Sequence, residues 1–181
     1  MDKWNGLFFN WYHSNDGSLM KEWGQFISTV DNGWLSAGLI TVGQAYPPSL
    51  YEETNKLVRA MDYSKLYDPA IGQMFGGYDA AAGKLTDFHF GMFYTEPRVA
   101  SYIAIGKNDV PEDHWWKMYR TLPRDWDWQG QIPEGQNVNH GGVDVFEGHY
   151  SYKGINYVPS WGGSTFEALM PTLVLKEKEL G

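Results

Sequence analysis

Residues 26–42, FISTVDNGWLSAGLITV, decide how this chain folds. Ser28 stands three residues before Asp31, which is the spacing of a capping box at the start of a helix. Apolar residues then recur at helical spacing through the rest of the stretch. The pattern predicts a helix that begins at Ser28 and that Pro47 and Pro48 terminate.

Start signals of the same kind predict four more helices. A small polar residue followed by an acid, or a proline in the first turn, marks each start. The expected starts are Ser49, Thr95-Glu96-Pro97, Asp109 with Pro111, and Ser164. Pro171 should kink or shorten the last of these helices.

The stretches between the helices are rich in glycine and aromatic residues. Residues 6–12 and 143–159 read as strands, and the second should be a hairpin that turns at Lys153-Gly154. Residues 121–142 show no periodicity over about twenty positions, and a loop of that length in a compact domain is usually functional or disordered. Trp126 and Trp128 within it favour a functional loop.

The composition limits what the chain can be. Its 181 residues fit a single domain over 1–181, and an aromatic content of 17% argues against disorder. The net charge of −8 argues against a nucleic-acid partner. The lack of cysteine excludes disulfides and thiolate metal sites. No apolar run approaches the roughly 18 residues that span a bilayer, so no membrane partner is expected.

Two glutamates stand at predicted helix starts. Glu96 precedes Pro97, and Glu167 follows Ser164 by three residues. Each has an ordinary explanation, Glu96 as a helix cap or a partner for Arg98 and Glu167 as the glutamate of a capping box. Two carboxylates that face one groove are also what glycosidic cleavage requires. One protonates the leaving oxygen, and the other attacks the sugar or activates water.

Four further polar residues are weaker candidates. Alternation places Asp144 opposite its valine neighbours and puts Glu147 and His149 together on one strand face. These three residues either contact a substrate or form a solvated strand edge. Asp31 either caps its helix or reaches a sugar hydroxyl.

Several common chemistries lack their motifs. His89, His114 and His140 show no HxH or HxxxH spacing, so we expect no metal site. Ser160 and Ser164 stand in no G-x-S-x-G motif, which disfavours a serine triad. No glycine-rich phosphate loop with its lysine is present.

Seven blocks of the sequence resemble the glucoamylase-like family, which is related to the endo-β-1,2-glucanases and to the glucoamylase-like region of cyclic β-1,2-glucan synthases. They occur in order and cover nearly the whole chain. The blocks are FFNWY (8–12), FISTVDNGWLSAGLI (26–40), LYDP (66–69), GGYD (76–79), TEPRVASYIAIGKNDVPEDHWWKMYRT (95–121), GVDVFEGHYSYKGI (142–155) and VPSWGGSTFEALMP (158–171).

The resemblance implies a mainly α fold with β-hairpins that is part of an (α/α)6 toroid. It implies a glycoside hydrolase or transglycosylase that acts on a β-linked glucan or related polysaccharide without a cofactor. Glu96 and Glu167 match the positions of the acidic pair. The positions that would bind substrate are Asp31, Arg98, Trp126, Trp128, Asp144, Glu147, His149 and Trp161.

The chain has about half the length of the family's usual domain and resembles its N-terminal half. An open half would expose apolar faces, so we expect self-association or a second chain that completes the fold. The alternatives to an enzyme are a non-catalytic carbohydrate-binding module and a partner subunit of a two-chain enzyme. A polysaccharide substrate favours an extracellular or periplasmic location, although the N-terminus is too short and polar for a signal peptide.

Overall fold

The computed structural model describes residues 1–46 and 48–180, and it shows a mixed fold. About 35% of these residues are helical and 24% are in strands. The expected mainly α fold, part of an (α/α)6 toroid, is therefore wrong. The reason is that, among the described residues, only three helices run for more than two turns, while short strands fill the glycine- and aromatic-rich stretches between them.

Helix α1 (Thr29–Ala45) is the longest element and begins as the sequence predicts. The Ser28 side chain accepts a hydrogen bond from the Asp31 N–H at 3.2 Å, which confirms the N-cap. Helix α2 (Pro48–Ala60) starts one residue before Ser49, so that serine lies inside the helix and is not its cap. Pro47, expected to terminate α1, lies outside the described residues.

The later helices are shorter than the pattern suggested. Helix α3 (Arg98–Gly106) follows Glu96 and Pro97, whereas the segment after Pro111 forms only the single turn of α4 (His114–Lys117). Helix α5 (Thr165–Leu169) is capped by Ser164, and Pro171 lies in the 3-10 turn η3 (Met170–Leu173) that ends it. The remaining helical elements are η1 (Lys21–Trp23), η2 (Tyr63–Leu66) and α6 (Glu177–Leu180).

In the part of the chain that the structure describes, the strands form four small antiparallel sheets. Two are two-stranded: β1 (Lys3–Trp4) with β2 (Leu7–Phe8), and β4 (Tyr67–Asp68) with β5 (Gln73–Met74). A third has the order β3-β6-β7, over Phe26–Ser28, Gly77–Asp79 and Lys84–Leu85. The fourth has the order β10-β9-β8, over Ile155–Tyr157, Val143–Tyr152 and Glu134–His140.

One strand prediction and one loop prediction need correction, and one strand prediction holds. Residues 6–12 contain only the two-residue strand β2, and residues 121–142 contain the seven-residue strand β8. The β8 residues alternate little in polarity, so their pairing with β9 could not be read from periodicity. The hairpin turn is confirmed, because Lys153 and Gly154 both adopt positive φ angles, 49° and 80°, between β9 and β10.

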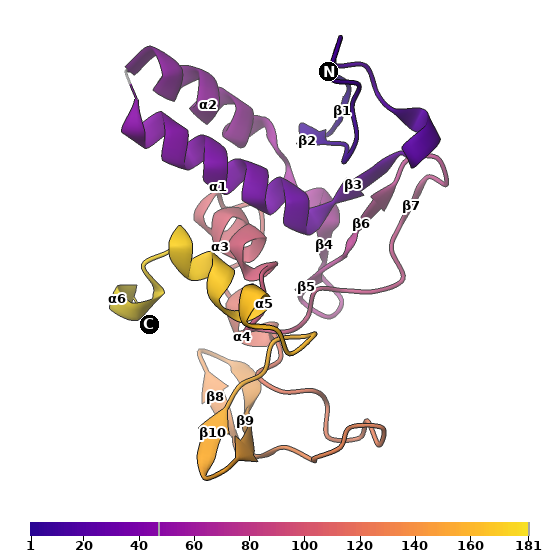
Figure 1. Ribbon diagram of the computed structural model, residues 1–181. Coiled ribbons are helices and arrows are strands. Elements are labelled where there is room, and N and C mark those ends of the chain that lie inside the picture. The colour runs from indigo at the N-terminus through magenta and orange to yellow at the C-terminus, as the bar shows by residue number, and fades with distance from the viewer. Residues whose placement is uncertain (47, 181) are drawn as a thin grey trace.

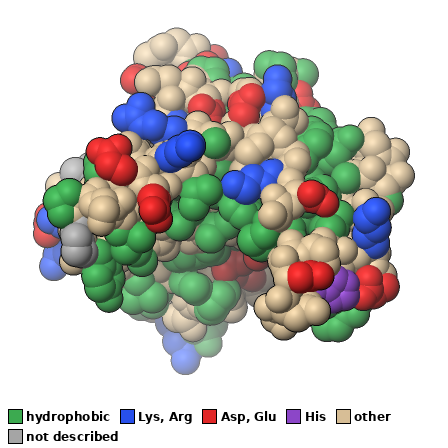
Figure 2. Space-filling model, turned by 90° about the horizontal axis from the view of Figure 1, so that it is seen from above, with side chains coloured by type: hydrophobic (Ala, Val, Ile, Leu, Met, Phe, Trp, Pro, Cys, Tyr) green, Lys and Arg blue, Asp and Glu red, His purple; other side chains and the backbone are tan. Residues whose placement is uncertain are grey.

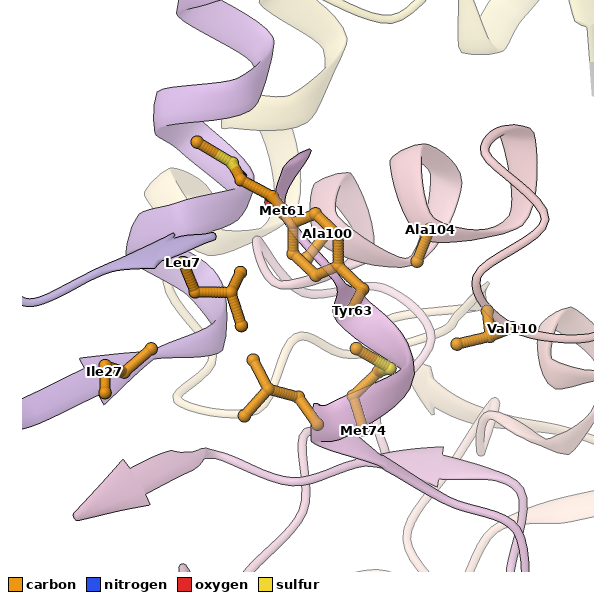
Figure 3. Packing of buried hydrophobic residues seen from close by; sticks show 9 residues of the cluster. Leu7, Ile27, Met61, Tyr63, Met74, Ala100, Ala104 and Val110 are labelled. Carbon is orange, nitrogen blue, oxygen red and sulfur yellow. Dashed lines mark hydrogen bonds between the residues drawn. The ribbon is translucent and has the colours of Figure 1, made fainter. Parts of the chain in front are cut away.

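The main core lies where β2, β3, α3 and the segment from Met61 to Met74 meet (Figure 3). Leu7, Ile27, Tyr63 and Met74 are almost fully buried in it. Helix α1 packs closely on α3 at Gly33, where an added Cβ would approach the Ala100 Cβ to 2.8 Å.

The elements are arranged in an elongated body (Figure 1). Helices α1 and α2 lie side by side at one end, and the β8–β9–β10 sheet lies at the other, with α3, α4 and α5 between them. No helix among the described residues is both long and apolar enough to cross a membrane.

Candidate active site

A cleft of about 570 Å³ gathers residues from segments far apart in the sequence. Its lining includes both predicted carboxylates, Glu96 and Glu167, and two of the predicted tryptophans, Trp126 and Trp161. Residues 87–92, which carry Phe88, His89 and Phe90, form another wall. The cleft is thus acidic and aromatic, which suits a ligand with both hydroxyl groups and flat apolar faces.

Glu96 lies in the turn that leads into α3. The Glu96 carbonyl accepts from the Val99 N–H at 3.2 Å, so the backbone here is the start of the helix. Burial raises the pKa of the Glu96 carboxyl above its usual value, and the negative charges of Glu167 and Asp31 raise it further. Its side chain makes no hydrogen bond within the described part of the chain.

Glu167 lies in the first turn of α5. Its N–H donates to the Ser164 Oγ at 3.2 Å, so the predicted cap at Ser164 is confirmed. Its carboxylate does not close a capping box on Ser164; instead its Oε2 accepts from the Gly162 N–H at 2.7 Å. A Cβ added at Gly162 would lie 2.5 Å from the Glu167 Oε1, so a side chain there would displace the carboxylate from this position.

Arg98 lies beneath the cleft and does not line it. Its side chain is 1% exposed and donates to the Thr95 and Ala168 carbonyls at 3.0 and 2.8 Å. The guanidinium also forms a bidentate ion pair with Glu177 at 2.5 and 2.8 Å. Arg98 therefore joins the turn that carries Glu96 to the helix that carries Glu167, which is a positioning role.

The tryptophans predicted to bind substrate divide into two groups. Trp126 and Trp161 line the cleft. Trp128 packs against Trp126 with ring centroids 5.8 Å apart and is 67% exposed, but it does not line the cleft. It lies at the margin of the aromatic wall.

The other predicted binding residues lie elsewhere. Asp31 accepts from the Asn10 Nδ2 at 2.9 Å and lines a separate hollow of about 250 Å³ beside β2. Asp144 lines a second cavity formed with β8 and β9. Glu147 contacts the His140 Nε2 at 2.8 Å, and His149 lies opposite Glu134 in the β8–β9 ladder.

One pair in the cleft wall was missed. The His89 Nε2 lies 3.0 Å from the Asp68 Oδ2, and the His89 ring packs on Phe75 with centroids 4.4 Å apart. The sequence around this histidine raised only the question of metal binding. No local signal links the pair, because an isolated bridge between Phe75 and His89 brings the segments together.

The other two histidines considered as metal ligands also have protein partners. His114 is buried, with Nδ1 2.8 Å from the Gly72 carbonyl and Nε2 2.8 Å from the Ser101 Oγ. The His140 ring stacks on Trp116 at 4.1 Å. Over residues 1–46 and 48–180, no three His, Asp or Glu side chains converge as metal ligands would.

Comparison with known proteins gives one informative similarity. Over 132 residues, or 73% of its length, the chain is 29% identical to the cyclic beta-(1,2)-glucan synthase NdvB of Rhizobium meliloti (strain 1021). The chain spans 4% of the length of that synthase. No family model matches the chain. The similarity supports a relation to the synthase and leaves the narrower glucoamylase-like assignment as a prediction.

Proposed function

We propose that the cleft cleaves a β-linked glucan, by hydrolysis or by transfer to another sugar, through Glu96 and Glu167. The observation that carries this proposal is the placement of both carboxylates in one aromatic-lined cleft, where the charge of Glu167 helps to raise the pKa of Glu96. Two carboxyl groups in different protonation states are what glycosidic cleavage needs.

The surroundings of the two groups suggest their roles. Burial and the neighbouring acids raise the pKa of Glu96, so it suits the acid that protonates the glycosidic oxygen as the C–O bond breaks. Glu167 accepts a hydrogen bond from the Gly162 N–H at 2.7 Å, which holds its carboxylate in place at the cleft. We assign Glu167 as the carboxylate that attacks the anomeric carbon or deprotonates the incoming water or sugar hydroxyl.

The similarity to a cyclic beta-(1,2)-glucan synthase supports a β-glucan as the substrate and makes the β-1,2-linked polymer the first to test. Trp126 and Trp161 would provide flat faces for the sugar rings. Hydrolysis and transglycosylation differ only in whether water or a sugar hydroxyl accepts the glycosyl group.

The test is incubation of the purified chain with β-1,2-, β-1,3-, β-1,4- and mixed-linkage glucans, followed by measurement of reducing ends and chromatography of the products. We expect Glu96→Gln and Glu167→Gln each to lower turnover at least ~100-fold, since each removes a proton-transfer or nucleophilic group. Glu53→Gln, an exposed change on α2, is the matched control and should retain turnover.

A carbohydrate-binding module is the second candidate, because Trp128 and Trp161 are 67% and 63% exposed near the cleft. In that case the wild type would bind the polymers without releasing products, and both glutamine variants would still bind. Release of products that persists in both glutamine variants would refute the assignment of the two glutamates.

A further inference from the structure

A second cavity, of about 770 Å³, adjoins the cleft. It lies between residues 116–124 and the β8–β9 strands, and it shares Ile71, Tyr119 and Leu122 with the lining of the cleft. Ile71 and Tyr119 are 46% and 42% exposed. A chain-like ligand could therefore pass from one hollow to the other across these three residues.

Arg120 is a buried cation in the wall of this cavity and is 6% exposed. Its Nη1 donates to the Trp115 and Met118 carbonyls at 3.2 and 2.8 Å. The guanidinium also lies over the Phe93 ring at 4.4 Å and the Trp116 ring at 5.4 Å. Among the described residues no carboxylate comes within 4.0 Å of it.

The positive charge of Arg120 is only partly balanced by nearby negative charges. Burial lowers the pKa of Arg120, and the charge of Glu147 opposes that shift at longer range. The Glu147 Oε1 is itself engaged by His140 at 2.8 Å. A buried charge is costly unless it is paired, so this position favours the approach of an anion.

Arg124 is a second cation on the same wall. It is exposed and lies over the Phe146 ring at 5.5 Å, and it forms no ion pair with any residue that the structure describes. Lys117 also lines the cavity, but Asp113 neutralises it at 2.7 Å. The carboxylate in the lining is Asp144, whose Oδ1 accepts from the Asn139 Nδ2 at 2.7 Å.

Two guanidinium groups without a carboxylate partner thus line one cavity of a chain whose net charge is −8. The fork of N–H donors on arginine matches the oxygens of a carboxylate or a phosphate. Trp116 and Phe146 also line the cavity, and each ring packs against one of the two guanidinium groups.

We propose that the second cavity binds the anionic group of an acidic sugar, either a carboxylate or a phosphate ester, on a glycan that continues into the cleft. The continuation into the cleft rests on the proposed function. The anion site itself rests only on Arg120 and Arg124.

The test is calorimetric titration of the full chain with glucuronate, glucose 6-phosphate and glucose. We expect both acids to bind at least ~10-fold more tightly than glucose, because charge-assisted hydrogen bonds are about twice as strong as neutral ones. Added salt should weaken only the binding of the acids. The preferred acid identifies the source of the anionic group.

Substitution of Arg124 and of Arg120 tests whether these two residues form the anion site. Arg124→Gln removes an exposed charge and should weaken the binding of both acids ~5-fold or more while leaving glucose binding unchanged. Arg120→Lys keeps the charge but loses the fork, so it should also weaken acid binding. Arg59→Gln on α2 is the control for net charge and should have no effect. Glu96→Gln should abolish turnover yet retain acid binding, which separates this inference from the proposed function.

Equal affinity for the three sugars would overturn the proposal. So would acid binding that Arg124→Gln and Arg120→Lys leave intact, or that Arg59→Gln weakens as much as Arg124→Gln. Acid binding without any glucan turnover would refute the proposed function and leave the anion site standing.

Discussion

Glu96 is a half-buried carboxyl group whose pKa is raised by burial and by the charges of Glu167 and Asp31, and it receives no hydrogen bond from the described residues. Such surroundings favour its protonated form. The folded chain therefore holds this proton to a higher pH than the unfolded chain does. Between the two pKa values the folded state binds more protons, so the stability falls as the pH rises through this window and stays lower above it.

This reasoning predicts that Glu96→Gln removes turnover without loss of stability. At pH 7 the variant should unfold at the wild-type temperature or about 1–3 °C above it, because glutamine lacks the unfavourable charge. The difference should shrink as the pH falls and vanish well below about pH 4.3, the ordinary glutamate pKa, where the carboxyl is protonated in both states. Thermal unfolding at both pH values measures it. A Glu96→Gln variant that is less stable than wild type at pH 7 would contradict the prediction.

The same reasoning gives the pH dependence of turnover in the wild type. An acid that must be protonated loses activity as the pH rises past its pKa. The pH at which activity falls to half on the alkaline side should therefore lie above the usual pKa of a glutamate. A profile of kcat that keeps rising past neutral pH would assign the acid role to another group.

Glu96 and Glu167 could be named as candidates because each lies at a helix-start signal, and the family resemblance then matched them to an acidic pair. The roles of their neighbours could not be read in the same way. Arg98 was expected to bind substrate, but Glu177, which lies far along the chain, holds it beneath the cleft. The surroundings of Asp144 and His89 could not be read either, since Asp144 lines the second cavity and His89 pairs with Asp68 from another segment.

At the scale of elements, the crossing of α1 and α3 depends on Gly33. An added Cβ there would lie 2.8 Å from the Ala100 Cβ and 3.0 Å from its backbone. Gly38 in the same helix has nothing within 4 Å of its added Cβ. The two glycines therefore separate the effect of packing from that of helix propensity.

We expect Gly33→Ala to lower the free energy of unfolding by about 1–3 kcal/mol through overpacking. Gly38→Ala should raise it by about 0.5–1 kcal/mol, because alanine favours the helix. Urea denaturation of the two variants and the wild type measures both changes. Equal stabilisation by the two substitutions would show that α1 and α3 do not approach as closely as the structure shows.

Helix starts could be predicted from the sequence because the residues that cap a helix lie next to it in the chain. The caps at Ser28 and Ser164 lie next to the helices that they start, and both were identified. Strands β3 and β6 pair across fifty residues and contain three residues each, so neither has a periodicity of its own. The toroid came from the resemblance alone, and the short strands overturned it.

At the scale of the whole molecule, apolar side chains remain on the surface of several helices. Leu35, Ile40 and Val42 of α1 are between 37% and 42% exposed. Phe166 and Leu173, in α5 and η3, are 59% and 79% exposed. Figure 2 shows hydrophobic side chains gathered between charged groups on the face seen from above. Apolar surface of this kind commonly marks an association site.

These exposed residues predict that the chain self-associates. Sedimentation velocity over low to high micromolar concentrations should show an increasing sedimentation coefficient. Ile40→Lys and Leu173→Lys should each raise the dissociation constant about 10-fold or more, because burial of such a side chain is worth about 1.5–3 kcal/mol. Ile155→Lys on β10, 67% exposed and outside these helices, is the control and should leave the constant unchanged. A single monomeric species over the whole range would refute the prediction, and equal effects of all three substitutions would place the contact elsewhere.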